Sequence, residues 1–246
     1  MRVTYIMNTI DRFDITPRVT LLNKTRAGRL INEFIITDNG STDQRIIRWG
    51  GMNAHKFIKN ETNVGNPQAL NNALDLATGD YIVIAGNDIE LTQNWLTEAI
   101  KVMEADKDVC VVGFGHDKGE RSNIAGVDVV KHQVATTGTV VLRKSNLKQL
   151  GYFATFSKYG YWDGDYCTRL RAAKLKDYFL PNVKMTHHGH DLGESTEYRK
   201  MKDAEAKKAR PHIVKLASQY GPSSHYLTKD NVVLNKDGKP ARKKRK

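Results

Sequence analysis

Apolar residues in the first part of the chain form short runs that alternate with segments of helical spacing. Residues 81–85 are a continuous apolar run after a Gly-Asp turn, typical of a buried strand, whereas residues 68–77 carry Leu and Ala at helical spacing. The pattern predicts strands at 2–7, 33–37, 56–58, 81–85 and 109–113, and helices at 17–31, 68–77 and 94–105. This alternation predicts an α/β fold with a Rossmann-like, mostly parallel sheet flanked by helices.

Polar residues follow the second and fourth predicted strands, where open α/β sheets place ligands. Asp38 and Asn39 begin a run of turn formers after the second strand, and Asp88 and Glu90 follow the fourth. In an extended segment, positions i and i+2 share a face, so Asp88 and Glu90 can point at one hard divalent cation. The alternative for Asp88 is a cap on the helix that starts near Thr92, and the alternative for Asp38 is an Asx-turn.

Three motifs, taken together in this order and spacing, resemble family 2 nucleotide-sugar glycosyltransferases, which have the GT-A fold. They are residues 38–43, 63–65 and 79–90. In that family, the aspartate after the second strand contacts the nucleotide base, and an Asp-x-Asp-like motif holds a divalent metal against the diphosphate. The resemblance implies a nucleotide-diphospho-sugar donor and a manganese or magnesium ion. It assigns donor binding to Asp38, Asn39, Gly65, Asn87 and Asp88, and metal binding to Asp88, to Glu90 in place of the usual second aspartate, and to His187.

The segment 161–170 resembles the family's acidic pair, spacer and second aspartate, followed by an arginine on a helix. The resemblance implies that Asp163 is the general base of an inverting reaction. Trp162 replaces the usual first acid, and Asp165 stands where the helix begins, so both are assigned to the acceptor side. The alternative for both aspartates is a charge that favours the first turn of a helix.

Two further segments of the second half resemble the family. Residues 134–143 resemble the strand that leads to a glycine-containing turn at the active site, which assigns Thr137 and Gly138 to the acceptor side. His187 best matches the family's histidine after the last strand, which contacts the metal or the diphosphate, and His188 is next. An exposed histidine cluster is the alternative, whereas a structural zinc site lacks a second His or Cys pair.

Length and composition indicate a globular chain. Its 246 residues suit one large or two small domains, with 27% charged and 39% hydrophobic residues. No apolar run approaches the roughly 20 residues of a membrane span, and the apolar start is too short for a signal peptide. Cys110 and Cys167 lie in or beside apolar segments, so we expect reduced core thiols and a cytoplasmic protein, in the host cell's cytoplasm if the chain is viral.

A net charge of +12 indicates a polyanionic partner, with solubility or compensation of a phosphorylated ligand as alternatives. Much of the charge lies near the C-terminus. We expect a GT-A domain at 1–195, with a nucleotide-sugar half at about 1–115 and an acceptor half at about 116–195, a basic helical extension at 196–235 broken by Pro211, and a disordered basic tail at 236–246.

These features predict a metal-dependent inverting glycosyltransferase. The charge, the basic C-terminal segments and the lack of a membrane signal suggest an acceptor that is DNA with a hydroxymethylated base, as for virus-encoded enzymes that glycosylate such bases. One alternative acceptor is a cell-envelope glycan or lipid-linked sugar. The alternative from another class is a nucleic-acid-binding protein that keeps the fold without catalysis.

Overall fold

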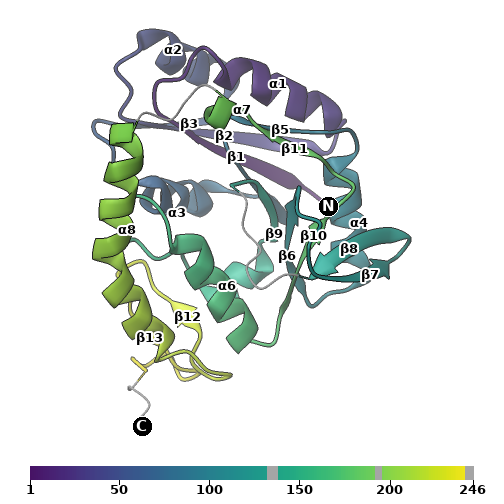
Figure 1. The fold of residues 1–246 in the computed structure, drawn as a ribbon, viewed down its shortest axis with the longest axis vertical. Helices are drawn as coiled ribbons and strands as arrows, with labels where there is room; N and C mark the ends of the chain where they lie inside the picture. The colour runs from purple at the N-terminus through teal and green to yellow at the C-terminus, as the bar shows by residue number, and fades with distance from the viewer. Residues whose placement is uncertain (132–137, 192–195, 242–246) are drawn as a thin grey trace.

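The computed structural model describes residues 1–131, 138–191 and 196–241, and within them nine strands form one central sheet (Figure 1). The strands are β1 (Val3–Thr9), β2 (Ile31–Asn39), β3 (Lys56–Asn60), β4 (Tyr81–Ala85), β6 (Val109–Phe114), β7 (Glu120–Ile124), β8 (Val127–Lys131), β9 (Val140–Arg143) and β10 (Lys176–Leu180). Across the sheet they follow the order β3-β2-β1-β4-β9-β6-β10-β8-β7.

The first four strands make the parallel part of the sheet. β1 pairs in parallel with β2 and β4, and β2 pairs in parallel with β3. β9 runs antiparallel between β4 and β6, β10 is parallel to β6, and β8 and β7 complete the sheet as an antiparallel hairpin. The predicted α/β fold is confirmed, with a mixed arrangement beyond β4. The carboxyl ends of β1, β2, β3 and β4 meet at one edge, which is the edge where such sheets bind ligands.

Eight helices lie within the described part of the chain. They are α1 (Thr16–Arg26), α2 (Gln44–Asn53), α3 (Asn66–Leu76), α4 (Trp95–Ala105), α5 (Ser145–Leu150), α6 (Trp162–Ala172), α7 (His188–Asp191) and α8 (Thr196–Ala217). Prolines stand in the first turns of α1 and α3, where their missing N–H is not needed. Asp43 caps α2 by accepting a hydrogen bond of 2.9 Å from the N–H of Arg45.

The hydrophobic core lies on both faces of the sheet, because side chains alternate along each strand. Tyr5 of β1 packs in one cluster with Trp95 and other residues of α4, whereas its neighbour Ile6 packs in a second cluster with Leu70 of α3 and Leu170 of α6. The two cysteines are buried free thiols, as predicted.

One predicted helix boundary and one unpredicted strand illustrate where the structure differs from the sequence analysis. The helix expected to reach residue 31 ends at Arg26, because Gly28 adopts a φ of +65° and the chain then enters β2. The hairpin strand β7 was not predicted, because its residues are mostly exposed and form no apolar run. No helix in the described ranges is long and apolar enough to cross a membrane.

The C-terminal segment is more ordered than the sequence predicts. α8 continues through Pro211 instead of breaking there, because the buried residues Ala209 and Leu216 anchor it on both sides of the proline. The antiparallel pair β12 (Tyr226–Leu227) and β13 (Val233–Leu234) follows. Residues 236–241 form a turn rather than a disordered tail, since the N–H of Ala241 donates to the Val233 carbonyl at 2.8 Å. Residues 242–246 lie outside the described ranges.

Candidate active site

A cleft of about 810 Å³ opens at the carboxyl ends of the parallel strands. It is bounded by the ends of β1 and β2, the turn after β4, the start of α6, the end of the strand β11 (Met185–His187) and the start of α7. The lining residues are Asn8, Thr9, Ile10, Arg12, Asp14, Asn39, Asn63, Asn66, Asn87, Asp88, Tyr159, Gly160, Trp162, His187, Gly189 and Lys202. Most of them carry amide, hydroxyl or charged groups, so the cleft suits a polar ligand.

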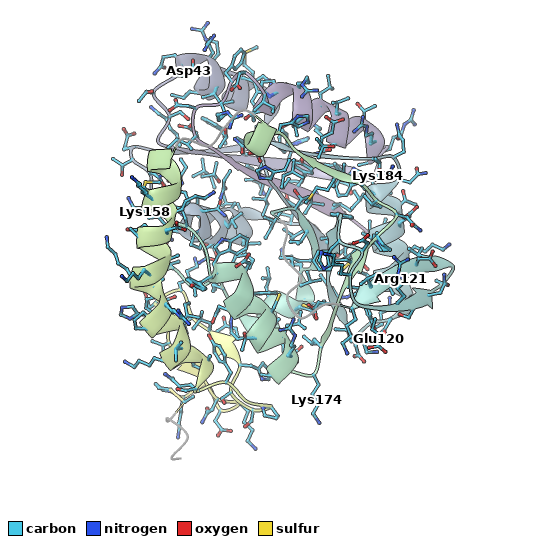
Figure 2. All side chains as sticks on the ribbon, viewed as in Figure 1. Asp43, Glu120, Arg121, Lys158, Lys174 and Lys184 are labelled. Atoms are coloured by element: carbon cyan, nitrogen blue, oxygen red, sulfur yellow. The ribbon has the colours of Figure 1, made fainter. Side chains whose placement is uncertain are left out.

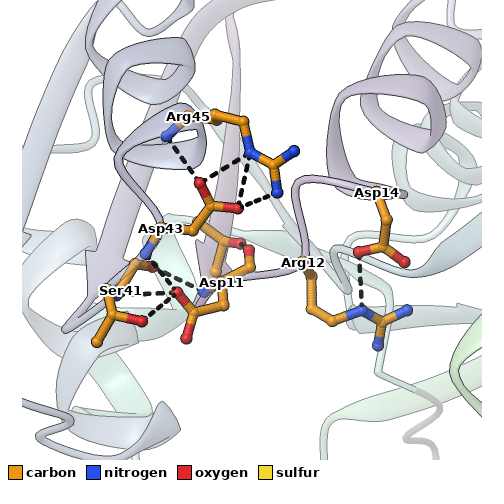
Figure 3. A network of polar contacts seen from close by, with 8 residues as sticks. Asp11, Arg12, Asp14, Ser41, Asp43 and Arg45 are labelled. Atoms are coloured by element: carbon orange, nitrogen blue, oxygen red, sulfur yellow. Dashed lines mark hydrogen bonds and ion pairs between the residues drawn. The ribbon is translucent and has the colours of Figure 1, made fainter.

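The loop after β1 is locked to the loop after β2 (Figure 3). The Asp11 carboxylate accepts hydrogen bonds of 2.8 Å from the N–H groups of both Thr42 and Asp43, and the Asp11 N–H donates to the Ser41 hydroxyl at 2.7 Å. Asp11 and Arg12 both have positive φ, at 50° and 59°. That conformation costs a residue with a side chain on the order of 1 kcal/mol. The network holds it, and Arg12 is thereby fixed at the cleft.

Asp38 and Asn39 occupy different environments at the end of β2. Asp38 is fully buried and is not among the described residues that line the cleft. Asn39 does line the cleft, and its amide is held on both sides: it donates to the Asn63 Oδ1 at 3.0 Å and accepts from the Asn60 amide at 3.1 Å. The structure therefore brings Asn39 to the site and places Asp38 behind it.

Gly65 shapes the wall of the cleft without lining it. Its φ is +90°, and a Cβ there would lie 2.8 Å from the Cα of Lys158. The close approach lets the Asn66 N–H donate to the Lys158 carbonyl at 2.9 Å, and the amide of Asn63 donates to the Tyr159 hydroxyl at 2.6 Å. These contacts position Asn63, Asn66 and Tyr159, which all line the cleft.

Asp88 and His187 meet in the cleft although they are far apart in sequence. β11 pairs antiparallel with the short strand β5 (Ile89–Leu91), with His187 opposite Ile89. The His187 Nε2 consequently lies 3.8 Å from the Asp88 Oδ1. Gly189 allows this approach, because a Cβ at Gly189 would lie 2.3 Å from the Asp88 Oδ2. Asn87 lines the cleft beside them.

Glu90 does not join Asp88. Asp88 lies in the turn before β5, so the alternation of an extended segment does not start there. The Glu90 carboxylate instead contacts Arg26 at 2.8 Å, His188 at 2.9 Å and Arg18 at 3.7 Å. Burial acts to raise the pKa of Glu90, but the hydrogen bonds from His188 and Arg26 outweigh it and hold the pKa below its ordinary value. Glu90 is absent from the described lining of the cleft.

The first turn of α6 places the predicted catalytic base and two predicted acceptor-side residues in different environments. Trp162 lines the cleft, with its ring edge-on to Phe153 at 4.9 Å between centroids. Asp163 is half-buried, and its Oδ1 accepts from the N–H of Gly164 at 2.8 Å. Asp165 is only 2% exposed and points away from solvent.

Asp165 forms a buried ion pair. Its carboxylate lies 2.9 Å from the Arg169 guanidinium and accepts a hydrogen bond of 2.5 Å from the Tyr220 hydroxyl. Arg169 also donates to the carbonyl groups of Leu150 and Tyr152. Asp165 therefore joins α6 to the C-terminal segment and does not face the cleft.

Of the two acceptor-side residues predicted in the glycine-containing turn, Gly138 lies in the described part of the chain. Gly138 has a φ of +72°, and a Cβ there would lie 2.8 Å from the Cδ1 of Ile89. It is not one of the described lining residues. Thr137 lies outside the described ranges.

Several lining residues were not predicted. Asn8, Thr9 and Arg12 follow the first strand, so their place at the carboxyl edge of the sheet was a usable signal. Tyr159 and Lys202 come from the second half of the chain, and no local motif marks them.

The Asp88 carboxylate and the His187 ring lie close enough that both could bind one divalent metal ion. No group of three or more His, Cys, Asp or Glu side chains converges within the described residues. Two protein ligands suffice where a metal also binds phosphate oxygens, and a carboxylate suits manganese or magnesium.

Comparison with known proteins supports a single fold family. The family model of "Glycosyl transferase family 2" matches residues 18–164. No curated protein matches the sequence.

Several solved structures share the fold at low identity. GalNAc-T7 with UDP, GalNAc and Mn²⁺ gives a TM-score of 0.65 at 13% identity, over 76% of this chain and 44% of that one. The mannosyltransferase PcManGT from Pyrobaculum calidifontis, in complex with GDP-Man and Mn²⁺, gives a TM-score of 0.64 at 19% identity. The match covers 87% of this chain and 64% of that one. S. aureus TarS 1-349 in complex with UDP-GlcNAc gives a TM-score of 0.58 at 15% identity. The match covers 89% of this chain and 71% of that one. The chain thus spans less than two thirds of the length of the first two.

Proposed function

The chain belongs to glycosyl transferase family 2, and we propose that it transfers a sugar from a nucleotide-diphospho-sugar to an acceptor hydroxyl, with inversion at the anomeric carbon. The observation that carries this proposal is the convergence of Asp88, His187 and Trp162 on one cleft at the carboxyl ends of parallel strands. Its volume of about 810 Å³ is within the range of pockets that enclose ligands of this size.

In this proposal the nucleoside binds to amides at the ends of β1 and β2, in the loop after β3 and at the start of α3. Asn39 and Asn63 are hydrogen-bonded to each other, and Asn8 donates to the Asn66 Oδ1 at 2.9 Å. Because these groups are held in place before a ligand arrives, binding requires little further ordering of side chains. Amides offer both donors and acceptors, as recognition of a base or ribose requires.

Asp88 and His187 would hold a divalent metal against the diphosphate. When bound, such an ion neutralises the charge that develops on the leaving group, which is worth several kcal/mol. Glu90 has no part in this proposal, because Arg26 and His188 occupy its carboxylate.

Asp163 is the general base of the proposal. Its carboxylate accepts the proton of the acceptor hydroxyl while the hydroxyl oxygen attacks the anomeric carbon opposite the diphosphate. The new carbon–oxygen bond forms as the bond to the phosphate oxygen breaks, so the configuration inverts. The position of Asp163 next to the cleft-lining Trp162 supports this role.

Mass spectrometry of reactions with a panel of UDP- and GDP-sugars tests the enzymatic proposal. We expect release of the nucleoside diphosphate from at least one donor in the presence of Mn²⁺, and loss of that release with a chelator. A protein that neither binds nor cleaves any donor would contradict the proposal.

For the acceptor we propose DNA that carries a hydroxymethylated base. The net charge of +12 supports this, together with a set of exposed basic residues on α8. That set is Lys200, Lys207, Lys208, Arg210 and Lys215. Phosphates of a duplex would contact these side chains, and the base would leave the stack to bring its hydroxyl to Asp163, at a cost of a few kcal/mol.

Duplexes with and without the hydroxymethyl group test the acceptor at low salt. The proposal predicts a mass increase of one sugar on the modified duplex alone, and binding that weakens steeply as salt is raised. Transfer to a saccharide or lipid-linked sugar, with no transfer to DNA, would contradict it. DNA binding without any donor binding would instead favour a non-catalytic nucleic-acid-binding protein.

A further inference from the structure

One face of α8 is apolar and packs against the rest of the protein. Its positions follow the spacing of four and three residues that places side chains on one side of a helix. They are Ala206, Ala209, Ile213 and Leu216, which are buried or half-buried. Continuing the same spacing by one turn toward the N-terminus of the helix reaches residue 202. A lysine stands there, and it is half-buried and lines the cleft.

The helix is fixed to the segment that forms one wall of the cleft. The His212 ring stacks on Phe156 with 4.9 Å between centroids, and the Glu205 carboxylate accepts from the N–H of Lys158 at 3.5 Å. Lys158 lies beside α8 (Figure 2) and is followed by Tyr159 and Gly160, which line the cleft. The position of Lys202 therefore depends on packing over several turns of α8 and not on a mobile loop.

The charges in the cleft indicate what Lys202 binds. The described lining contains two acids, Asp14 and Asp88, and two side chains that are always basic at neutral pH, Arg12 and Lys202. Arg12 contacts Asp14 at 3.3 Å, and Asp88 faces His187 at 3.8 Å. The nucleoside diphosphate that leaves carries more negative charge than one divalent ion neutralises, because its phosphate oxygen gains a charge when the bond to the sugar breaks. A lysine in a partly enclosed cleft suits such a group.

We infer that Lys202 binds the diphosphate of the donor, so that α8 completes the donor site. This inference rests on the proposed function and adds a residue from outside the region of the family match, residues 18–164. The ammonium group would contact phosphate oxygens and stabilise the negative charge that remains on the leaving group after transfer. The outward face of the same helix, with Lys200 and Lys207, is separate from this role.

Calorimetric titration of UDP and GDP with Mn²⁺ tests the inference on the full chain. Lys202→Ala removes the ammonium group, and Lys202→Met removes it while keeping most of the aliphatic stem. Both should weaken binding of the preferred nucleoside diphosphate about tenfold or more, because a charge-assisted hydrogen bond is lost. Binding of the corresponding unphosphorylated nucleoside should not change. Lys202→Arg should keep the diphosphate affinity within a few-fold.

Lys101→Ala is the matched control, because Lys101 carries the same charge, is exposed on the helix α4 and is not among the described residues that line the cleft. It should bind the diphosphate as the wild type does. Wild-type affinity in both Lys202→Ala and Lys202→Met would overturn the inference and leave the proposed function standing. A wild-type protein that binds neither diphosphates nor nucleotide sugars would overturn both.

Discussion

The segment from the turn after β4 into β5 and the first turn of α6 each carry two carboxylates separated by one residue. Asp88, in the turn, lines the cleft, whereas Glu90, in β5, lies outside it in ion pairs. In α6, Asp163 is half-buried beside the cleft, whereas Asp165 is buried in the interior. The same spacing thus produces one carboxylate at the site and one held in an ion pair, first in a turn that enters a strand and then in a helix.

The partners of these carboxylates explain the difference. Glu90 contacts Arg26 at 2.8 Å, and Asp165 contacts Arg169 at 2.9 Å. Within the described residues, neither Asp88 nor Asp163 is paired with an arginine or lysine. A carboxylate whose oxygens are held by a guanidinium has few positions left for a metal or a proton. The comparison therefore teaches that the arginine partners, more than the sequence spacing, separate the acids proposed to function from the structural ones.

The largest effect is expected at the helix. Asp163→Asn keeps the shape of the side chain but removes the proton acceptor, so kcat should fall by about 10²–10⁴. Donor affinity should stay at the wild-type level, because Asp163 acts on the acceptor. Steady-state transfer kinetics and donor titration measure the two quantities. Near-normal turnover would remove Asp163 from its assigned role.

The second member of that pair should affect stability. Asp165→Asn breaks the buried ion pair and leaves the Arg169 guanidinium uncompensated, which should lower the free energy of unfolding by about 3–5 kcal/mol. Tyr220→Phe removes only one hydrogen bond to the same carboxylate and should cost about 1.5–3 kcal/mol, because that bond is made to a charged group. Urea unfolding measures both. If Asp165→Asn unfolds at the same urea concentration as the wild type, the structural role is wrong.

The smallest effect is expected at Glu90. Glu90→Gln weakens contacts to Arg26 and His188 that are partly exposed, so stability should fall by about 1 kcal/mol. Donor affinity should change by less than a few-fold. A fall in metal-dependent donor binding as large as that of an Asp88 variant would show that Glu90 binds the metal. The difference proposed between Asp88 and Glu90 would then be wrong.

Much of the fold was predictable from the sequence. Apolar runs located β1, β4 and β6, because buried strands have few polar positions. Five of the predicted site residues line the cleft: Asn39, Asn87, Asp88, Trp162 and His187. The motif order was informative because the carboxyl ends of parallel strands meet at one edge.

The remainder depends on tertiary packing. Asp38 and Asn39 are adjacent, and only the pairing of β2 with its neighbours decides which one faces the cleft. From the sequence alone, Asp165 is an ordinary acid in the first turn of a helix. Only the fold shows that it contacts Tyr220 and Arg169. In the sequence, Lys202 is one of many lysines in a basic segment. The apolar face of α8 that turns it toward the cleft has only a few residues, so the sequence pattern does not distinguish it.

The most direct test of the account is donor titration into Asp88→Asn and the wild type, each with and without Mn²⁺, with Glu90→Gln as the matched control. If Asp88 holds the metal against the diphosphate, Mn²⁺ should strengthen donor binding to the wild type and to Glu90→Gln by at least tenfold, and should have little effect on Asp88→Asn. Equal strengthening in Asp88→Asn and the wild type would contradict the account.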